Sequence, residues 1–152
     1  QDKKVVFPVK TTPLPDTGRN MWLYDGGLRL KVFSGDERLR FVFDTGNVRA
    51  DMFYPYYQKH KEWIEKEGHK ETISGGGFGG VRTLDVFRLP STPMRLGNTS
   101  FEMENIQVEC NIPEIDGFQN EEDGSLGMDF INLFHRVTIN LESMYLNVEK
   151  DN

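Results

Sequence analysis

The chain has 152 residues, of which 37% are hydrophobic and 28% are charged, and its formal net charge is −6. This length suits one globular domain with a buried core, and an acidic chain without a basic block is a poor partner for nucleic acid. No apolar run approaches the roughly 18 residues of a membrane span. The single cysteine, Cys110, excludes an internal disulfide and a cysteine-based metal site.

The N-terminal part of the chain carries weak signals of structure. Residues 3–10 are predicted to contain a short strand, and residues 11–27 are rich in Pro, Gly and Asp, which predicts a loop. We therefore assign residues 1–27 to an N-terminal strand and loop, and residues 28–152 to the main folded domain.

Apolar and charged residues alternate from residue 28 onward, which predicts two strands joined by a turn at 34–37. The side chains expected to face the core are those of Leu28, Leu30, Val32, Leu39, Phe41 and Phe43. Arg29 and Lys31 are expected on the opposite face. The second strand ends directly before Asp44-Thr45-Gly46, so a buried strand delivers a carboxylate into a Thr-Gly turn.

The longest helical pattern extends from about Tyr54 to Glu67. Tyr57, Trp63 and Ile64 are expected on one face of this helix, and Gly68 is expected to be its C-cap.

The rest of the chain predicts a mainly β protein with one further, short helix. The expected segments are a glycine-rich hairpin at 72–89, a strand at 101–110, an acidic loop at 111–124, a helix at 128–135 and a closing hairpin at 137–148. Pro90 and Pro93 are expected to break the strand pattern after the glycine-rich hairpin. A change of phase near Glu104 and Asn105 predicts a bulge in the strand that follows.

Three motifs follow one another along the chain: Phe43-Asp44-Thr45-Gly46, the glycine-rich run Ser74–Gly80, and the segment Gly124–Phe130. Together they resemble the retropepsin-like aspartic proteases, single-lobe relatives of pepsin that include the retroviral enzymes. The resemblance covers about Leu28 to Val148 and is strongest to the bacterial branch of that family. It implies a closed β barrel with one longer helix after the Asp-Thr-Gly loop and one short C-terminal helix.

The resemblance implies an endopeptidase in which Asp44, Thr45 and Gly46 form half of a catalytic site acting on a peptide or protein. Two carboxylates about 3 Å apart repel by roughly 5 kcal/mol at an effective dielectric constant of about 20, so such a pair shares one proton. One member can then deprotonate the attacking water while the other donates to the scissile carbonyl. The second Asp is expected from the mate of a two-fold homodimer or from a second lobe of a longer chain.

The glycine-rich run corresponds in the resemblance to a flap that bends over the substrate. The residues expected to bind substrate are Gly76, Gly77, Phe78 and Gly79. Gly124, Leu126 and Gly127 are expected to pack beneath the Asp44 loop. Asp129 is expected at the N-terminus of the short helix, where the helix dipole favours it, without a catalytic role.

The sequence also departs from the family pattern. The family usually has Ala or Ser directly after Asp-Thr-Gly and Ser or Thr three positions further, where this chain has Asn47 and Ala50. The missing hydroxyl supports an alternative, a non-catalytic peptide-binding or interaction module on the same fold. Arg49 is a further departure, since a guanidinium that pointed inward would favour the charged form of Asp44. A remoter alternative is a structural β domain of a larger secreted protein.

Other signals favour ordinary structural roles. Asp16-Thr17-Gly18 follows no apolar strand and is interpreted as a turn. The glycine-rich run lacks the Lys-Ser/Thr ending of a phosphate loop. His60, His69 and His135 have no metal-ligand spacing, so neither a metal nor a cofactor is expected. If Gln1 is a mature N-terminus, a periplasmic or secreted location is favoured.

Overall fold

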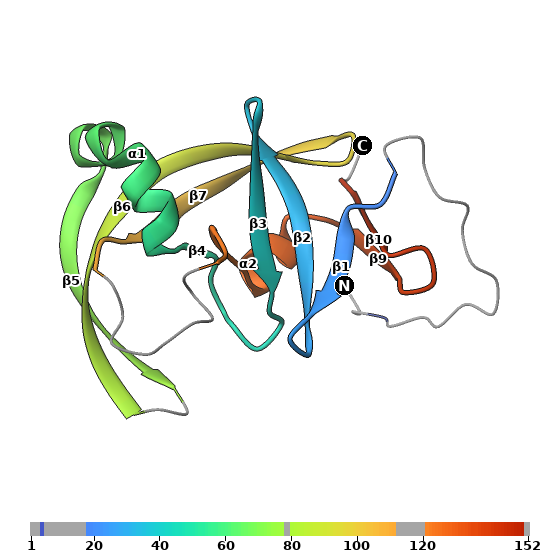
Figure 1. Cartoon of the computed structure of the whole chain (residues 1–152), viewed down its shortest axis with the longest axis horizontal. Helices are drawn as coiled ribbons and strands as arrows, with labels where there is room; N and C mark the ends of the chain where they lie inside the picture. Colours follow the sequence, from blue (N-terminus) through green and yellow to red (C-terminus); the bar gives the residue numbers. More distant parts are fainter. Residues whose placement is uncertain (1–3, 5–17, 78–79, 112–120, 151–152) are drawn as a thin grey trace.

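The structure is a computed structural model, and it describes residues 4, 18–77, 80–111 and 121–150. Ten strands and two helices lie in these ranges (Figure 1). In chain order they are β1 (Met21–Tyr24), β2 (Gly27–Ser34), β3 (Glu37–Phe43), β4 (Asp51–Met52), α1 (Tyr54–Glu67), β5 (His69–Gly77), β6 (Gly80–Leu96), β7 (Thr99–Glu109), β8 (Gly124–Leu126), α2 (Met128–Asn132), β9 (Arg136–Asn140) and β10 (Tyr145–Glu149).

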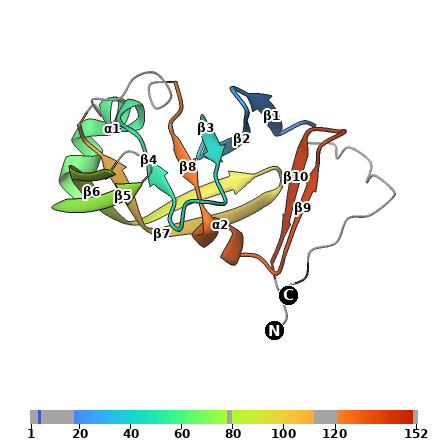
Figure 2. The same ribbon diagram turned by 90° about the horizontal axis from the view of Figure 1, so that it is seen from below.

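Six of these strands close into a barrel. Neighbouring strands pair in the order β2, β3, β8, β4, β7, β6, and β6 returns to β2 through the pairing of Phe33 with Arg95. β1 extends this sheet beyond β2, and β5 extends it beyond β6. β9 and β10 form a separate two-stranded sheet, which lies at the opposite end of the molecule from α1 (Figures 1 and 2). The prediction of a mainly β closed barrel with two helices is confirmed.

The barrel interior is filled by the apolar side chains that alternation assigned to it. Leu30, Val32, Leu39 and Phe41 are fully buried. At the base of the barrel the ring of Phe130 in α2 lies 6.4 Å from that of Phe43, with the two rings nearly perpendicular, which is a favoured aromatic geometry. This contact ties α2 to the end of β3.

Arg29 is buried, although alternation predicted it on an outer, solvated face. It does lie on the outer face of β2, but residues 121–123 cover that face at this point. The Arg29 Nε donates to a carboxylate oxygen of Glu122 at 2.9 Å, and neither side chain is exposed by more than 3%. The acid that neutralises Arg29 is 93 residues away in the chain, so no local pattern could reveal it.

The segment 11–27 was predicted to be loop, and this prediction is wrong for its last part. Met21–Tyr24 forms β1, which pairs with β2 through a two-residue turn at Asp25 and Gly26. Both turn residues have positive φ, 45° and 70°, which is typical of the tight hairpin turns that match strand twist. The predicted strand at 3–10 lies almost wholly outside the described residues, and the division of the chain at residue 27 stays a prediction.

β6 runs through both prolines that were expected to end it. The partners Leu89 with Ile106 and Ser91 with Glu104 keep the same register on both sides of Pro90, so the expected bulge near Asn105 is also absent from this described ladder. Pro90 lacks an N–H, and it falls opposite Asn105, whose φ of 54° takes that residue out of the ladder. The β6–β7 ladder is therefore interrupted at this one pair and continues on both sides of it.

The helix predictions hold with two corrections. α1 has the predicted bounds, and Tyr57 and Ile64 are buried, but Trp63 is 42% exposed and does not share their face. Gly68 is the C-cap in extended geometry, and a Cβ there would lie 2.6 Å from the Ile64 carbonyl oxygen. Close approach of the backbone, not a left-handed conformation, therefore requires this glycine. α2 is shorter than predicted.

Candidate functional site

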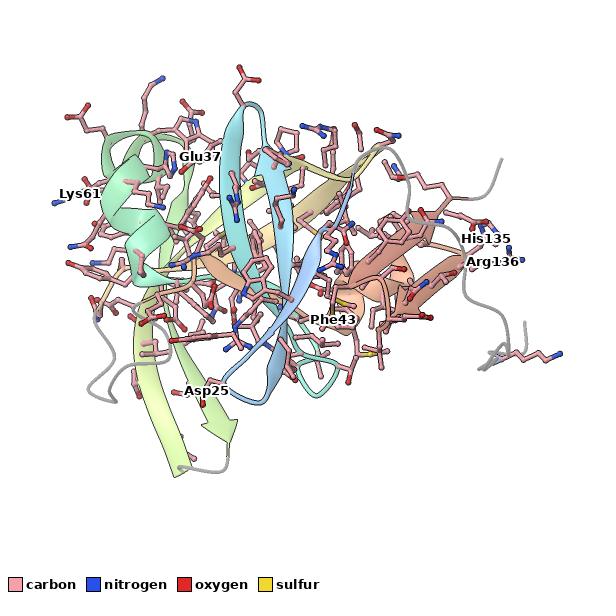
Figure 3. The ribbon with its side chains drawn as sticks, turned by 45° about the vertical axis from the view of Figure 1, so that its right-hand side comes forward. Asp25, Glu37, Phe43, Lys61, His135 and Arg136 are labelled. Carbon is pink, nitrogen blue, oxygen red and sulfur yellow. The ribbon has the colours of Figure 1, made fainter. Side chains whose placement is uncertain are left out.

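The Asp44 loop leaves the barrel at the end of β3. Phe43, labelled in Figure 3 where β3 meets the loop, pairs in parallel with Leu126 of β8, and the Asp44 N–H donates to the Leu126 carbonyl at 3.1 Å. The chain then turns, because the Asn47 N–H donates to the Asp44 carbonyl at 3.2 Å. The Gly46 N–H donates to the Asp44 carboxylate at 2.9 Å and orients it. Asp44, Thr45 and Gly46 are all exposed, so the strand presents a fixed carboxylate at the surface.

The start of α2 holds this loop from below. The Met128 N–H donates to the Asn47 carbonyl at 2.8 Å, and the Asp129 N–H donates to the Val48 carbonyl at 3.2 Å. In return the Ala50 N–H donates to the Asp129 carboxylate, with both oxygens at 2.8 Å. Asp129 lies in the first turn of α2 as predicted, and its carboxylate also secures the loop, which sequence reasoning missed.

The glycines of the late motif make this close contact possible. A Cβ on Gly127 would lie 2.6 Å from the Asn47 carbonyl oxygen, and one on Gly124 would lie 2.2 Å from the Asp51 carbonyl oxygen. Leu126 between them is fully buried. The structure therefore places Gly124, Leu126 and Gly127 beneath the Asp44 loop, where the family resemblance implied them.

A second carboxylate, Asp51, lies under the loop in a polar cluster that sequence reasoning missed. The Ser125 hydroxyl donates to Asp51 at 2.7 Å, and the Asn47 side-chain amide lies 3.4 Å from Asp51 and 3.2 Å from the Ser125 hydroxyl. Burial raises the pKa of Asp51 from 3.8 to about 6, against the hydrogen bonds from Ser125 and Asn47, which lower it. The sequence signal that could have indicated a buried Asp51 is its position between the apolar residues Ala50 and Met52.

Asp51 makes folding stability depend on pH. Because its pKa is higher in the folded protein, the folded state binds more protons between about pH 4 and 6, and stability falls as pH rises through this window. A tenfold change in proton affinity corresponds to about 1.4 kcal/mol, so a rise from 3.8 to about 6 corresponds to about 3 kcal/mol. Asp51→Asn is expected to remove this loss of stability. In urea unfolding, the free energy of unfolding of the variant should therefore rise relative to that of the wild type between pH 4 and 7. Asp36→Asn, in the exposed β2–β3 turn, is the control, and an equal gain there would contradict the assignment.

Among the described residues, the side chains of Asn47 and Ala50 form no hydrogen bond with Asp44, although the Asn47 N–H donates to the Asp44 carbonyl. The Asn47 amide is directed to Ser125 and Asp51, and the Ala50 side chain is only 3% exposed. In the described part of the chain, the Thr45 hydroxyl forms no hydrogen bond. Arg49 is exposed and lines a hollow of about 600 Å³ beside β5, β6 and β7.

The glycine-rich hairpin is formed by β5 and β6, which remain paired up to Gly77 and Gly80 and project beyond the barrel (Figure 1). Gly76 and Gly77 lie in its paired arms, opposite Val81 and Gly80. Phe78 and Gly79, two of the predicted substrate-binding residues, lie outside the described residues.

In the described ranges of the chain, no group of three or more His, Cys, Asp or Glu side chains is placed to hold a metal ion. None of the helices there is long and apolar enough to cross a membrane.

Comparison with known proteins points to one fold. No model of a protein family matches the sequence, and no curated protein does either. Among solved structures, the retroviral protease-like domain of Ddi1 from Leishmania major is similar, with a TM-score of 0.55 and 16% identity over 83% of this chain and 90% of that one. The fold is retropepsin-like. A retropepsin-like aspartic protease from Rickettsia conorii also matches, with a TM-score of 0.45 and 18% identity over 81% of each chain.

The retropepsin-like fold accounts for the geometry of the loop. β3 and β8 run in parallel, and the polypeptide leaves both at the same end, so that the Asp44 turn and the start of α2 meet there. The other two carboxylates near the loop, Asp51 and Asp129, are engaged with Ser125 and with the Ala50 N–H. The arrangement therefore offers Asp44 as the exposed carboxylate of this loop.

Proposed function

We propose that this protein is an aspartic-type endopeptidase in which Asp44 supplies one carboxylate of a catalytic pair. The observation that carries the proposal is the exposed Asp44 carboxylate on a loop that three backbone hydrogen bonds from the α2 region and β8 hold in place. General acid–base catalysis needs such a group at a fixed position next to the reacting atoms.

In the proposed reaction, Asp44 and a second Asp share one proton because two adjacent carboxylates cannot both ionise at low cost. The ionised member takes a proton from the attacking water, while the protonated member donates to the scissile carbonyl oxygen. The water oxygen bonds to the carbonyl carbon to give a tetrahedral intermediate. This intermediate collapses as the C–N bond breaks: the carboxyl that took the water proton gives it to the leaving nitrogen, and a hydroxyl proton of the intermediate returns to the other carboxylate. No covalent bond to the protein forms.

The second carboxylate is proposed to come from a two-fold related copy of the chain, because a two-fold axis beside Asp44 would bring each loop to face its own copy. Val48, four positions after Asp44, is 73% exposed, so a two-fold contact beside the site would cover this apolar side chain. The unpaired Thr45 hydroxyl would reach across the same axis. A second lobe of a longer chain is the competing source.

The β5–β6 hairpin is proposed to act as a flap over the bound peptide. Gly76, Gly77, Phe78 and Gly79 are proposed to bring backbone amides against the substrate, because glycines allow close approach of the backbone.

The proposal is tested by peptide cleavage at acidic pH together with the mass in solution. We expect cleavage that pepstatin blocks, in a protein that sediments as a dimer. Val48→Glu is expected to weaken self-association at least about tenfold, since each dimer would bury two charges at the contact, and to lower cleavage most at low protein concentration. Leu23→Glu, at an apolar side chain of β1 that is 61% exposed, is the control.

A non-catalytic peptide-binding module on the same fold is the second candidate. It is favoured by the observation that the Asn47 amide is directed away from Asp44 and that Ala50 has no hydroxyl to offer. A monomer that binds pepstatin or peptides without cleaving them would support this candidate and contradict the endopeptidase.

A further inference from the structure

We propose that the outer face of β1, β2 and β3 is a docking surface for an extended acidic peptide segment of another protein. The surface, called here the outer basic face, consists of Trp22, Lys31 and Arg38, with Arg19 at its border. This inference concerns a second binding site and does not depend on the proposed proteolysis.

The strand register places these side chains in one row. Trp22 pairs with Arg29, two residues before Lys31 on β2, and Arg40, which pairs with Lys31, is two residues after Arg38 on β3. Paired residues of antiparallel strands lie on the same face, and diagonal neighbours lie roughly 7–8 Å apart. Neighbouring side chains in the row from Trp22 through Lys31 to Arg38 are therefore spaced about as far apart as alternate side chains of an extended peptide, which are roughly 7 Å apart.

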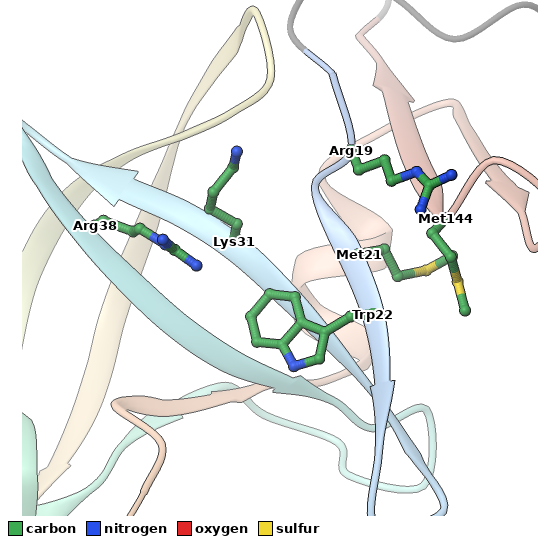
Figure 4. Close-up of a pocket in the computed structure, with 6 residues that line it drawn as sticks. All are labelled: Arg19, Met21, Trp22, Lys31, Arg38 and Met144. Carbon is green, nitrogen blue, oxygen red and sulfur yellow. The ribbon is translucent and has the colours of Figure 1, made fainter.

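The row borders a surface hollow, shown in Figure 4. The hollow has a volume of about 310 Å³ and is lined by Arg19, Met21, Trp22, Lys31, Arg38 and Met144. In this view the Trp22 ring and the Arg38 guanidinium extend toward each other across β2, with Lys31 above them. An aromatic ring beside two cations suits a ligand that has one apolar group followed by acidic groups.

The same strand face already binds acidic residues of this chain beside the row, at Arg29, which pairs with Trp22, and at Arg40, which pairs with Lys31. Glu122 pairs with Arg29 at 2.9 Å and lies 3.8 Å from Arg40. The backbone joins this contact, because the Asp123 N–H donates to the Arg40 carbonyl at 2.8 Å and the Arg40 N–H donates to the Asp123 carboxylate at 2.8 Å. The acidic residues Glu122 and Asp123 thus lie along part of this strand face, and Glu122 neutralises Arg29 and Arg40.

The other cations of this face have no such partner. Within the described ranges, Arg19, Lys31 and Arg38 form no ion pair, although the chain carries 24 acidic and 18 basic residues. An acidic peptide would complete the charge pairing that Glu122 begins. A peptide suits the site better than nucleic acid, because a net charge of −6 repels a long polyanion.

The Arg38 end of the outer basic face is remote from the Asp44 carboxylate, whereas Trp22 lies level with Val42 through Arg29, two residues before Asp44. Arg38 lies near the start of β3, and Asp44 follows its end. The six residues from Arg38 to Asp44 span about 20 Å of extended strand. A protein anchored on this face could hold a distant segment near the Asp44 loop without occupying it.

The test uses Trp22 as its own reporter. In the full chain with Trp63→Phe, which leaves Trp22 as the single tryptophan, we would titrate an octapeptide of alternating leucine and glutamate and follow the indole fluorescence. We expect saturable binding that weakens with salt, no response to the matched leucine–glutamine peptide, and a loss of affinity of about tenfold in Lys31→Gln/Arg38→Gln.

Lys61→Gln/Lys66→Gln on the exposed face of α1 removes the same charge elsewhere and is the matched control; Lys61 is labelled in Figure 3. Asp44→Asn in the same background prevents turnover of the peptide, so binding is read separately from the proposed endopeptidase activity. Equal loss in the control pair, no saturable response, or displacement of the peptide by pepstatin would overturn the proposal. Tighter binding of a single-stranded oligonucleotide than of the acidic peptide would overturn it in favour of nucleic acid.

Discussion

Asp44→Asn is expected to abolish peptide cleavage while leaving the fold intact. Without the Asp44 carboxylate, the pair can no longer share a proton. In a homodimer the substitution removes both carboxylates of the pair. General acid–base catalysis contributes about 10²- to 10⁴-fold, so the rate should fall by about that factor. The measurement is cleavage of a peptide library at acidic pH.

The fold should tolerate this change because the Asp44 side chain is exposed and its hydrogen bond from the Gly46 N–H can be kept. The Gly46 N–H donates to one carboxylate oxygen, and the Asn amide oxygen can accept the same hydrogen bond. Asp36→Asn removes an equal charge from the exposed β2–β3 turn and should retain full activity. Proteolysis that persists in pure Asp44→Asn protein, and that pepstatin still blocks, would show that another carboxylate does the chemistry.

Gly124→Ala is expected to be the most damaging single-methyl change in the described part of the chain. The added carbon would lie 2.2 Å from the Asp51 carbonyl oxygen and 2.8 Å from the Phe41 ring. Neither can move freely, because β8 pairs with both β3 and β4 at this point. Overpacking costs about 1–3 kcal/mol where side chains can adjust. Because the clash here is with a backbone carbonyl, we expect the free energy of unfolding in urea to fall by about 3 kcal/mol or more.

Gly26→Ala provides the comparison for this change. Gly26 has a φ of 70° and no atom within 4 Å of an added Cβ, so its cost is limited to the left-handed backbone, about 1 kcal/mol. A loss at Gly124 no larger than the loss at Gly26 would mean that β8 can shift away from β4.

Local patterns sufficed for the elements that carry the site. Alternation alone placed Asp44 at the end of a buried strand, and helical periodicity gave the bounds of α1, since both depend on neighbours a few residues away. The glycine-rich hairpin and the late glycine segment were likewise visible as composition.

Contacts between distant residues could not be predicted in the same way. The buried Arg29 depends on Glu122, and Asp51 is hydrogen-bonded to Ser125, 74 residues later in the chain, which lowers the pKa that burial raises. Pro90 stays within β6 because of what lies opposite it on β7. In each case the side chain's role is decided by a partner that sequence spacing does not identify.

The parallel pairing of β3 with β8 also determines when the Asp44 loop can form. The contacts that hold this loop join residues about 80 positions apart, such as Ala50 with Asp129, and contacts of such high sequence separation form late in folding. During synthesis, Asp44 leaves the ribosome long before Gly124–Phe130 can close beneath it. A nascent chain would therefore carry an unassembled, inert carboxylate until most of the domain had been made.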